Sequence, residues 1–249
     1  MTDALYLEDS EQTQFVATVD RTAGDRVVLD QTAFYPEGGG QPADTGSLKL
    51  KDGDESWSVT DVQKKDTIYH HLELENGAEP PAPGTTVVGE LDADRRRAHN
   101  RYHTAQHLLS AVLLEEFDAQ TTGNQLYADR ARLDCAYERF DDADLERLEQ
   151  RLNDLVDDEL PVTWETLDRE DAEARLDPDR TRLHLLPESI TEVRIVQIGT
   201  DDALIDRTAC AGTHVENTAE IGRLEVTGRE TRGPDEERVR FQLGADPRQ

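Results

Sequence analysis

The sequence contains only two cysteines, Cys135 and Cys210, among its 249 residues. Two thiols are too few for the disulfide framework that stabilises small secreted domains, so that class of protein is excluded. Cys135 lies in a stretch where apolar residues alternate with polar ones, and we expect its side chain to pack in the core. Cys210 lies four residues before a histidine, which makes it the better candidate for metal chemistry.

Long hydrophobic runs are also missing. Hydrophobic residues make up 35% of the chain, and no apolar run approaches the roughly eighteen residues that a membrane-spanning helix needs. The first residues, Met1–Leu5, show no basic region leading into a hydrophobic one, which is the pattern of a secretory signal. We therefore expect no membrane association and a location in the cytoplasm.

Positive charge is scarce. The chain has 27 basic and 55 acidic residues, a net charge of -28, and its lysines are Lys49, Lys51, Lys64 and Lys65. A disordered acidic chain would lack the regular hydrophobic pattern of this sequence, so we interpret the composition as a folded protein adapted to a very salty, halophilic cytoplasm. Molar salt shortens the screening length to about 3 Å. The negative charge therefore does not exclude a nucleic acid as the partner.

Residues 1–92 are predicted to form a first domain, a small β-barrel. Short segments with strand character alternate with turn residues at regular intervals, which is typical of barrels. The predicted strands are Phe15–Val19, Arg26–Leu29, Ser47–Leu50, Trp57–Val62, Thr67–Leu72 and Thr86–Gly89. Between them lies a glycine-rich loop, Phe34–Gly46, whose glycines would let one backbone approach another closely. An ordinary flexible turn explains that composition equally well.

Residues 93–249 are predicted to form a second, α/β domain, so the whole chain belongs to the α+β class. Asp92 or Asp94 can N-cap a helix whose apolar residues recur at helical spacing as far as Phe117. A second, amphipathic helix is predicted over Asp142–Val156, and Thr121–Leu126 is predicted to be a loop. The remaining strands are Ala131–Tyr137, Pro161–Leu167, Glu192–Ile198, Ile221–Val226 and Arg238–Leu243. Helices should pack on this mostly antiparallel sheet in two layers.

Two short motifs, about a hundred residues apart, carry metal-binding side chains. His103 and His107 lie four residues apart on the predicted helix, so both imidazoles project from one face and can bind one ion. The motif Ala209–Val215 adds the Cys210 thiolate and the His214 imidazole. Three imidazoles and a thiolate form the mixed nitrogen and sulfur set that zinc prefers.

Neither motif is specific by itself. A pair of histidines four residues apart can arise on any helix by coincidence, and a lone cysteine is usually a small buried hydrophobe. The chain has only seven histidines and two cysteines, so two such clusters are harder to explain by chance, and we predict one Zn2+ per chain. A zincin protease fits poorly, because its helix needs a glutamate base where this helix has Thr104. His70 and His71, on a predicted strand, are interpreted as structural.

The segments Phe34–Gly46, His103–His107 and Cys210–His214, in this order and spacing, together resemble the freestanding alanyl-tRNA editing proteins called AlaX. The resemblance spans nearly the whole chain and is to the medium-length type, in which a β-barrel precedes the editing domain also built into alanyl-tRNA synthetase. The zinc ligands that it implies are His103, His107, Cys210 and His214. The glycines that it associates with tRNA recognition are Gly38, Gly39, Gly40 and Gly46.

The resemblance also implies an activity, the hydrolysis of the ester that joins a wrong amino acid to the 3'-terminal adenosine of tRNA(Ala). The aminoacylation pocket of a synthetase that accepts alanine cannot sterically reject glycine and disfavours serine only modestly. The implied substrates are therefore chiefly Ser-tRNA(Ala), with Gly-tRNA(Ala) as the second candidate. The hydroxyl that senses serine falls at or near Thr121, with Thr122 as the fallback. Alanine would leave such a hydroxyl unpaired, at a cost of about 1–3 kcal/mol.

The chemistry is expected to use a water positioned or activated by the metal, since no Ser/His/Asp constellation or carboxylate pair competes for it. Four protein ligands saturate a tetrahedral zinc, whereas a catalytic zinc keeps one position open. Either one ligand yields, or the zinc only organises the pocket. Gln106 and Thr213, inside the two motifs, are candidates for orienting the water or the amino acid, and local packing is the alternative role for both.

Two other functions share these motifs. An editing domain acting on serine attached to tRNA(Thr) also combines a paired-histidine helix with a Cys/His segment, but Phe34–Gly46 argues against it. A non-catalytic tRNA-binding module, in which zinc only stabilises the fold, is the alternative from another class. The acidic segment Arg229–Glu237 departs from the basic turn that the resemblance would suggest, and it argues against an RNA contact there. The sequence leaves a monomer and a dimer equally open.

Overall fold

The computed structural model describes residues 2–74, 78–176, 181 and 190–248. The chain divides into two compact units, Met1–His99 and Asn100–Gln249, and each has its own hydrophobic core. The helix α1 (Ala93–Phe117) begins in the first unit and continues in the second. The predicted domain boundary between residues 92 and 93 stays a prediction. No helix in the described part of the chain is long and apolar enough to cross a membrane.

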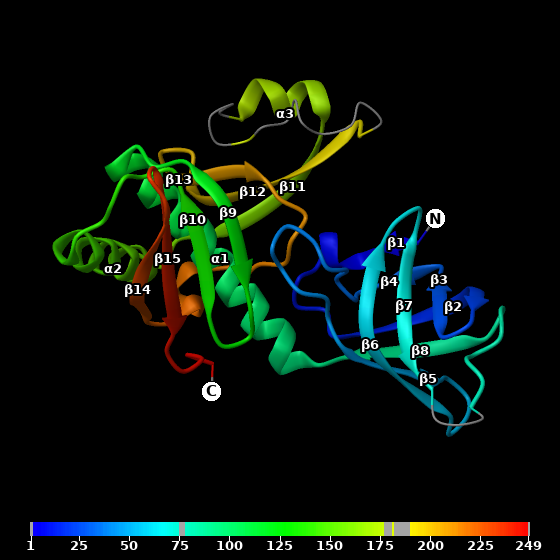
Figure 1. Cartoon of the computed structure of the whole chain (residues 1–249). Helices are drawn as coiled ribbons and strands as arrows, with labels where there is room; N and C mark the ends of the chain where they lie inside the picture. The colour runs from blue at the N-terminus through cyan, green and yellow to red at the C-terminus, as the bar shows by residue number, and fades with distance from the viewer. Residues whose placement is uncertain (1, 75–77, 177–180, 182–189, 249) are drawn as a thin grey trace. The chain divides into compact units, whose positions relative to one another are not determined.

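Within the described residues, the first unit is a closed barrel with the strand order β2–β3–β7–β6–β5–β8, drawn in blue to cyan in Figure 1. All its pairings are antiparallel. The strands are β2 (Gln14–Ala23), β3 (Arg26–Leu29), β5 (Gly46–Leu50), β6 (Ser56–Lys64), β7 (Ile68–Glu73) and β8 (Thr86–Leu91). Closure leaves the barrel without a free edge.

Short elements complete this unit. The strands β1 (Asp3–Ala4) and β4 (Gln31–Thr32) pair in parallel, and a 3-10 turn, η1 (Leu5–Leu7), follows β1. The barrel is filled by apolar side chains from alternate positions of its strands, as the period of a strand requires. The predicted barrel is thereby confirmed.

The glycine-rich segment contains a tight hairpin turn. The backbones of Gly38 and Gln41 exchange hydrogen bonds of 3.1 and 2.9 Å, and the two residues between them, Gly39 and Gly40, have φ values of 60° and 84°. Such left-handed angles favour glycine in a two-residue turn. Gly46 has a different reason, because a Cβ added there would lie 2.1 Å from the Glu90 carbonyl oxygen. The close approach of two backbones thus occurs at Gly46.

A buried ion pair ties this segment to the first turn of α1. The Asp44 carboxylate accepts a hydrogen bond from the Tyr35 backbone N–H at 2.7 Å and pairs with the Arg96 guanidinium. The Arg96 and Asp44 side chains are each only 1% exposed. Arg96 also donates to the carbonyls of Ser10, at 3.1 Å, and Ala33. The carboxylate and the guanidinium of this buried ion pair therefore both have hydrogen-bond partners besides each other, as burial of charge requires.

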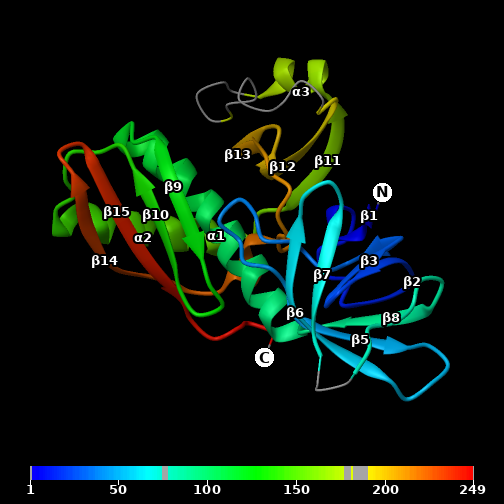
Figure 2. The same ribbon diagram turned by 45° about the vertical axis from the view of Figure 1, so that its right-hand side comes forward.

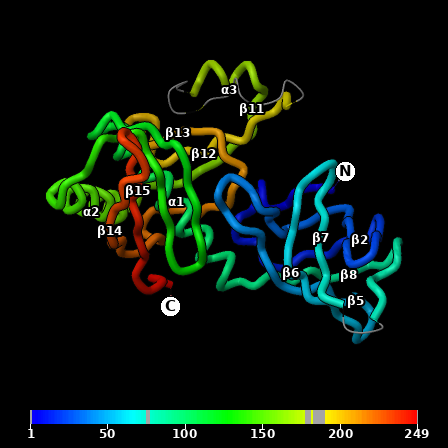
Figure 3. Tube along the Cα trace, in the orientation of Figure 1, coloured from blue at the N-terminus to red at the C-terminus, as the bar shows by residue number. Residues whose placement is uncertain are grey.

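The described residues of the second unit form two antiparallel sheets. The first has the order β14–β15–β10–β9 (Figure 2), and the second has the order β11–β12–β13 (Figure 3). Its strands are β9 (Thr121–Leu126), β10 (Ala131–Cys135), β11 (Val162–Asp168), β12 (Glu192–Thr200), β13 (Ala203–Ala209), β14 (Leu224–Gly233) and β15 (Glu236–Leu243). Besides α1, the helical elements among its described residues are α2 (Asp142–Asp157), α3 (Arg169–Arg175) and η3 (Thr218–Ile221).

The core of this unit joins α1 and α2 to both sheets. Leu109 of α1, Leu152 of α2, Phe241 of β15 and Val196 of β12 all belong to one buried cluster. Two layers of helix and antiparallel sheet were predicted, and the α+β class is confirmed; the strands are divided between two sheets. Cys135 is fully buried on β10, as its alternating context predicted.

The prediction of a loop over Thr121–Leu126 was wrong. These residues form the edge strand β9, which pairs with β10 from Leu126↔Ala131 to Thr121↔Cys135. Gly123 and Asn124 suggested a turn, but the turn comes after the strand, where the Tyr127 N–H donates to the Arg130 carbonyl at 2.8 Å. Strand propensity depends on the pairing partner, and β10 supplies it.

Candidate metal centre

The candidate site is assembled in the second unit from α1 and the loop that follows β13. The Asp92 side chain caps α1 by accepting a hydrogen bond from the Arg95 N–H at 3.0 Å, and the helix then runs unbroken to Phe117. His103 and His107 therefore share one face, with ring centroids 5.2 Å apart. His214 lies 4.5 Å from the first ring and 4.8 Å from the second, between centroids.

The donor atoms are close enough to share one metal ion. The ligand atoms of His103, His107, Cys210 and His214 all lie within 4.8 Å of one another. The Cys210 sulfur is 3.6 Å from His103 Nε2 and 3.4 Å from His214 Nε2. Bonds of about 2.3 Å to sulfur and about 2.0 Å to nitrogen would separate these atoms by about 3.5 Å in a tetrahedron. The predicted ligand group can hold a metal ion.

Arg194 of β12 fixes the loop that carries Cys210. Its guanidinium donates to the carbonyls of Cys210 at 2.8 Å and Gly212 at 3.0 Å, and the Cys210 N–H donates to the Arg194 carbonyl at 3.1 Å. The guanidinium also lies 5.0 Å from the centre of the Trp164 ring. Sequence reasoning missed this residue, although a lone arginine inside the apolar strand pattern Glu192–Ile198 was a signal for it.

Asp206, also missed from the sequence, holds one of the candidate ligands. His107 Nδ1 donates to the Asp206 carboxylate at 2.8 Å, and the two side chains are 10% and 1% exposed. A neutral imidazole that donates through Nδ1 keeps its lone pair on Nε2, which leaves that atom for the metal. Asp206 lies four residues before Cys210, but its position in the sequence alone does not reveal which side chain it meets.

Thr104 does the same for His214. Its hydroxyl donates to the Asn100 carbonyl at 2.9 Å, so it acts as acceptor toward His214 Nδ1 at 3.2 Å and the Val215 N–H at 3.2 Å. His214 Nε2 is thereby left on the side of the Cys210 sulfur. Such partners of the second ring nitrogen are typical of metal-binding histidines.

Burial and neighbouring charges shift the pKa of three of these groups. Burial raises the pKa of the Cys210 thiol, but His103 and His214 outweigh it and bring the pKa well below the usual value. Burial and the neighbouring His103 lower the pKa of His214 to about 3. Burial also lowers the pKa of His107, but Asp206 and Cys210 raise it to about 10. A thiolate and a neutral His214 are the protonation states of metal ligands, and His107 would release its Nε2 proton when a metal binds.

Gln106 and Thr213 are both buried next to the ligands in the chain. Gln106 Nε2 donates to the Arg132 carbonyl of β10 at 3.1 Å, and its Oε1 is buried without a hydrogen-bond partner among the described residues. Thr213 is fully buried within the Cys210–His214 loop. Their assignment as residues that orient water or substrate stays a prediction.

The two candidate threonines have different surroundings. The Thr121 hydroxyl is partly buried and lies 2.7 Å from the Ser110 hydroxyl of α1. Ser110 follows His107 by three residues, so both lie on one stripe of the helix. Thr122 is exposed and donates to Glu236 at 2.8 Å. Thr121 therefore faces the helix that carries two of the ligands, and Ser110 is a neighbour that the sequence gave no reason to single out.

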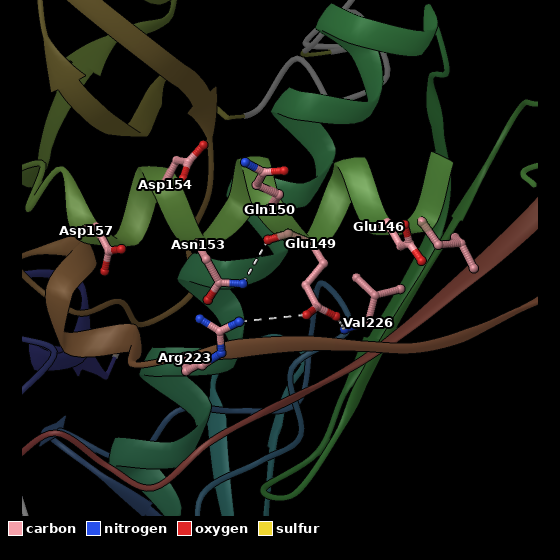
Figure 4. A pocket seen from close by; sticks show the side chains of 9 residues that line it. Glu146, Glu149, Gln150, Asn153, Asp154, Asp157, Arg223 and Val226 are labelled. Atoms are coloured by element: carbon pink, nitrogen blue, oxygen red, sulfur yellow. Dashed lines mark hydrogen bonds and ion pairs between the residues drawn. The ribbon is translucent and has the colours of Figure 1, made fainter. Parts of the chain in front are cut away.

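A separate pocket of about 350 Å³ lies between α2 and β14 (Figure 4). The residues that line it are Leu145, Glu146, Glu149, Gln150, Asn153, Asp154, Asp157, Arg223 and Val226. Asn153 exchanges hydrogen bonds of 2.8 and 3.0 Å with the Leu224 backbone, and Glu149 accepts one of 2.9 Å from the Val226 N–H. These side chains cover the edge of the sheet, and none of the described lining residues belongs to the metal group.

Comparison with known proteins gives matches in both units. The family "tRNA synthetases class II (A)" matches residues 3–95, and "Threonyl and Alanyl tRNA synthetase second additional domain" matches residues 193–240. The chain is 39% identical to the alanyl-tRNA editing protein AlaX-M of Methanosarcina barkeri, over 98% of this chain and 99% of that protein. It is 40% identical to AlaX-M of Methanosarcina mazei, over 98% and 97%.

A longer relative matches as well. The alanine–tRNA ligase of Thermococcus kodakarensis is 38% identical over 98% of this chain, but the match covers only 26% of the ligase. The matched part of that ligase thus corresponds to nearly all of the present sequence.

Proposed function

Because the chain belongs to the family of the alanyl-tRNA editing proteins AlaX-M, we propose that it is a deacylase that hydrolyses mischarged tRNA(Ala). The substrate is chiefly Ser-tRNA(Ala), and Gly-tRNA(Ala) is the second one. The observation that carries this proposal is the convergence of three imidazoles and a thiolate in the part of the chain that matches editing proteins. The protein would act in the cytoplasm, where tRNA is aminoacylated.

We propose that the ion held by this group is Zn2+, one per chain. The ligands would be His103, His107, Cys210 and His214, whose mixed nitrogen and sulfur donors and separations suit tetrahedral zinc. Zinc bound there would supply Lewis-acid character for a water or the ester carbonyl. The protein's own contribution is to keep the thiolate and two imidazoles aimed at one point through Arg194, Asp206 and Thr104.

Selectivity for serine is proposed to come from Thr121. Its hydroxyl bonds with Ser110, on the stripe of α1 that carries His107. If Ser110 donates in that bond, the Thr121 proton is free for the hydroxyl of a seryl ester, and if Thr121 donates, its lone pairs are free to accept. Alanine can make neither bond, so the remaining hydrogen-bonding capacity of the Thr121 hydroxyl would be unsatisfied beneath a bound alanyl ester and the correct ester would be spared.

The proposal is tested by deacylation assays with the purified full chain in molar KCl. Ser-tRNA(Ala), Gly-tRNA(Ala), Ala-tRNA(Ala) and Ser-tRNA(Thr) are supplied in parallel. We expect rapid hydrolysis of the first, slower hydrolysis of the second and little of the last two. Hydrolysis of Ser-tRNA(Thr) in preference to Ser-tRNA(Ala) would instead support the threonine-specific alternative. Binding of tRNA without hydrolysis of any ester by the zinc-loaded protein would support the non-catalytic one.

High salt is the proposed working condition. The net charge is -28, and some of the described arginine ion pairs are fully at the surface, such as Arg130–Asp129 with side chains 57% and 70% exposed. Exposed pairs of this kind stabilise little, whereas repulsion among excess carboxylates is relieved when salt screens it. The free energy of unfolding should therefore rise with KCl concentration into the molar range.

A further inference from the structure

Asp206 is a carboxylate whose side chain is 1% exposed, on β13 of the second unit. Aspartate is rarely buried unless it is paired, because removing an ionised carboxylate from water costs much free energy. Its carboxylate accepts a hydrogen bond of 2.8 Å from His107 Nδ1. The bond joins residues 99 positions apart in the sequence, and so it connects the strand before the Cys210 loop directly to the helix that carries His107.

The bond determines which nitrogen of His107 is available. With Nδ1–H directed at the carboxylate, only Nε2 can act as a ligand. The ring also packs against the His214 ring, with an interplanar angle of 87° and centroids 4.8 Å apart. A carboxylate acceptor also makes an imidazole a stronger donor to a metal than a neutral acceptor does.

His107 and His214 differ in the group that orients each ring. His214 is oriented by the neutral hydroxyl of Thr104, at 3.2 Å, whereas His107 is oriented by a charged group at a shorter distance, 2.8 Å. His107 is also the more exposed of the two, since its side chain is 10% exposed and His214 is fully buried. His107 therefore has less packing to hold its ring and depends more on its hydrogen bond.

We propose that Asp206 is a positioning residue of the metal centre, which acts through His107 by fixing its ring with Nε2 toward Cys210 and by strengthening it as a ligand. This inference rests on the proposed zinc site. It does not rest on the identity of the tRNA or on catalysis, so metal affinity can be measured without any substrate.

The first experiment measures the dissociation constant for Zn2+ of the full chain by competition with a chelator, in molar KCl. Asp206→Ala should weaken zinc binding by about 10- to 100-fold. Asp206→Asn should weaken it less, because the amide oxygen still accepts a hydrogen bond from Nδ1 but carries no charge. The matched control is Asp201→Asn, which removes a carboxylate with 81% side-chain exposure from the same β12–β13 hairpin; its zinc affinity should equal that of the unmodified protein.

The second experiment separates positioning from a general effect on the fold. Zinc affinity is measured for His107→Ala and for the double variant His107→Ala/Asp206→Ala. If Asp206 acts through His107, its removal should change affinity by less than about threefold once His107 is gone, because coupled residues are not additive. The visible spectrum of the Co2+-loaded protein gives an independent signature, since a displaced imidazole alters the ligand field.

Several results would overturn the inference. These are unchanged zinc affinity in both Asp206 variants, an equal loss in the Asp201→Asn control, or full additivity with His107→Ala. A wild-type chain that binds no zinc would overturn it too. If Asp206→Ala fails to fold, Asp206→Asn and the cycle built on it decide the matter. A wild-type protein that binds zinc but deacylates no tRNA would sink the proposed function and leave this inference standing.

Discussion

Both units bury ionisable side chains, but the partners of these side chains differ between the two units. In the barrel, Asp44 is paired with the permanently charged Arg96, and both side chains are 1% exposed. In the second unit, Asp206 is equally buried but is paired with His107, an imidazole with a second nitrogen left over. The charged groups of the first pair make their hydrogen bonds to other groups of the protein. In the second pair, the Nε2 atom of His107 remains available to bind a metal ion.

The buried histidines repeat this contrast. His70 of the barrel is fully buried, with Nε2 2.8 Å from the Thr32 hydroxyl and Nδ1 3.3 Å from the Val27 carbonyl. Both of its nitrogens are occupied by the fold. His107 and His214 each place Nδ1 on a protein group and turn Nε2 toward the Cys210 sulfur or its neighbours. A buried histidine with one committed nitrogen is therefore a better sign of a metal site than burial alone.

The largest effect is expected from Cys210→Ala, which removes the thiolate of the proposed site. Zinc content should fall from one per chain to well below one half, and deacylation of Ser-tRNA(Ala) should fall at least about 100-fold, as expected if the proposed metal is lost from the site. The control is Cys135→Ala, because burial raises the pKa of the Cys135 thiol to about 12 and makes it inert. Equal zinc content in the two variants would contradict the ligand assignment.

Next in size is Arg96→Met, which leaves Asp44 buried without its cation. Breaking a buried ion pair typically costs about 3–5 kcal/mol, so the free energy of unfolding by guanidinium chloride should fall by that order. Arg21→Ala in the same barrel removes an exposed pair with Asp66, whose side chains are 53% and 70% exposed, and a hydrogen bond to the Tyr69 hydroxyl at 2.8 Å, and should lower the free energy of unfolding much less. Similar losses in both variants would show that the buried pair stabilises the barrel no more than the exposed one does.

A pH dependence is expected from His70. Burial lowers its pKa from 6.5 to about 4, so the unfolded chain binds a proton more readily than the folded barrel does. Its contribution to stability is therefore present above pH 6.5 and is lost as the pH falls toward 4, with an upper limit of about 3 kcal/mol. Unfolding at pH 7 and pH 5 should show a smaller decrease for His70→Gln than for the unmodified protein. An identical decrease would exclude His70 as the source.

The smallest effect concerns the choice between serine and alanine. Thr121→Val removes the hydroxyl that bonds with Ser110 but keeps the shape, and it should slow hydrolysis of Ser-tRNA(Ala) by an amount equivalent to about 1–3 kcal/mol. Zinc content should not change. Thr122→Val is the matched control, because that side chain is exposed and bonds with Glu236. Since glycine has no hydroxyl, an equal loss on Gly-tRNA(Ala) would show that Thr121 shapes the site without sensing serine.

Repeating patterns are what the sequence by itself determined. Alternating and helical periodicities come from backbone geometry, so the barrel strands, the helix ending at Phe117 and the amphipathic helix α2 could all be placed in advance. The four candidate metal donors were proposed in advance, from the spacing of His103 and His107 on one helix and from the short Cys210–His214 motif, and the structure places their side chains close together. The strand β9 was missed, because its own residues do not indicate that it pairs with β10.

Only the tertiary structure decided which polar groups meet. Asp206 is one of many acidic residues in a chain with 55 of them, and nothing nearby in the sequence distinguishes it; the fold buries it against His107, 99 residues away. The contacts of Arg194, Thr104 and Ser110 with the candidate site were likewise revealed only by the fold. Such contacts depend on how separate elements pack, and a buried charge or hydroxyl is stable only where that packing supplies its partner. The physical reason is that local periodicity determines which face of a helix or strand a side chain lies on, whereas the hydrogen-bond partner of that side chain belongs to a different helix, strand or loop.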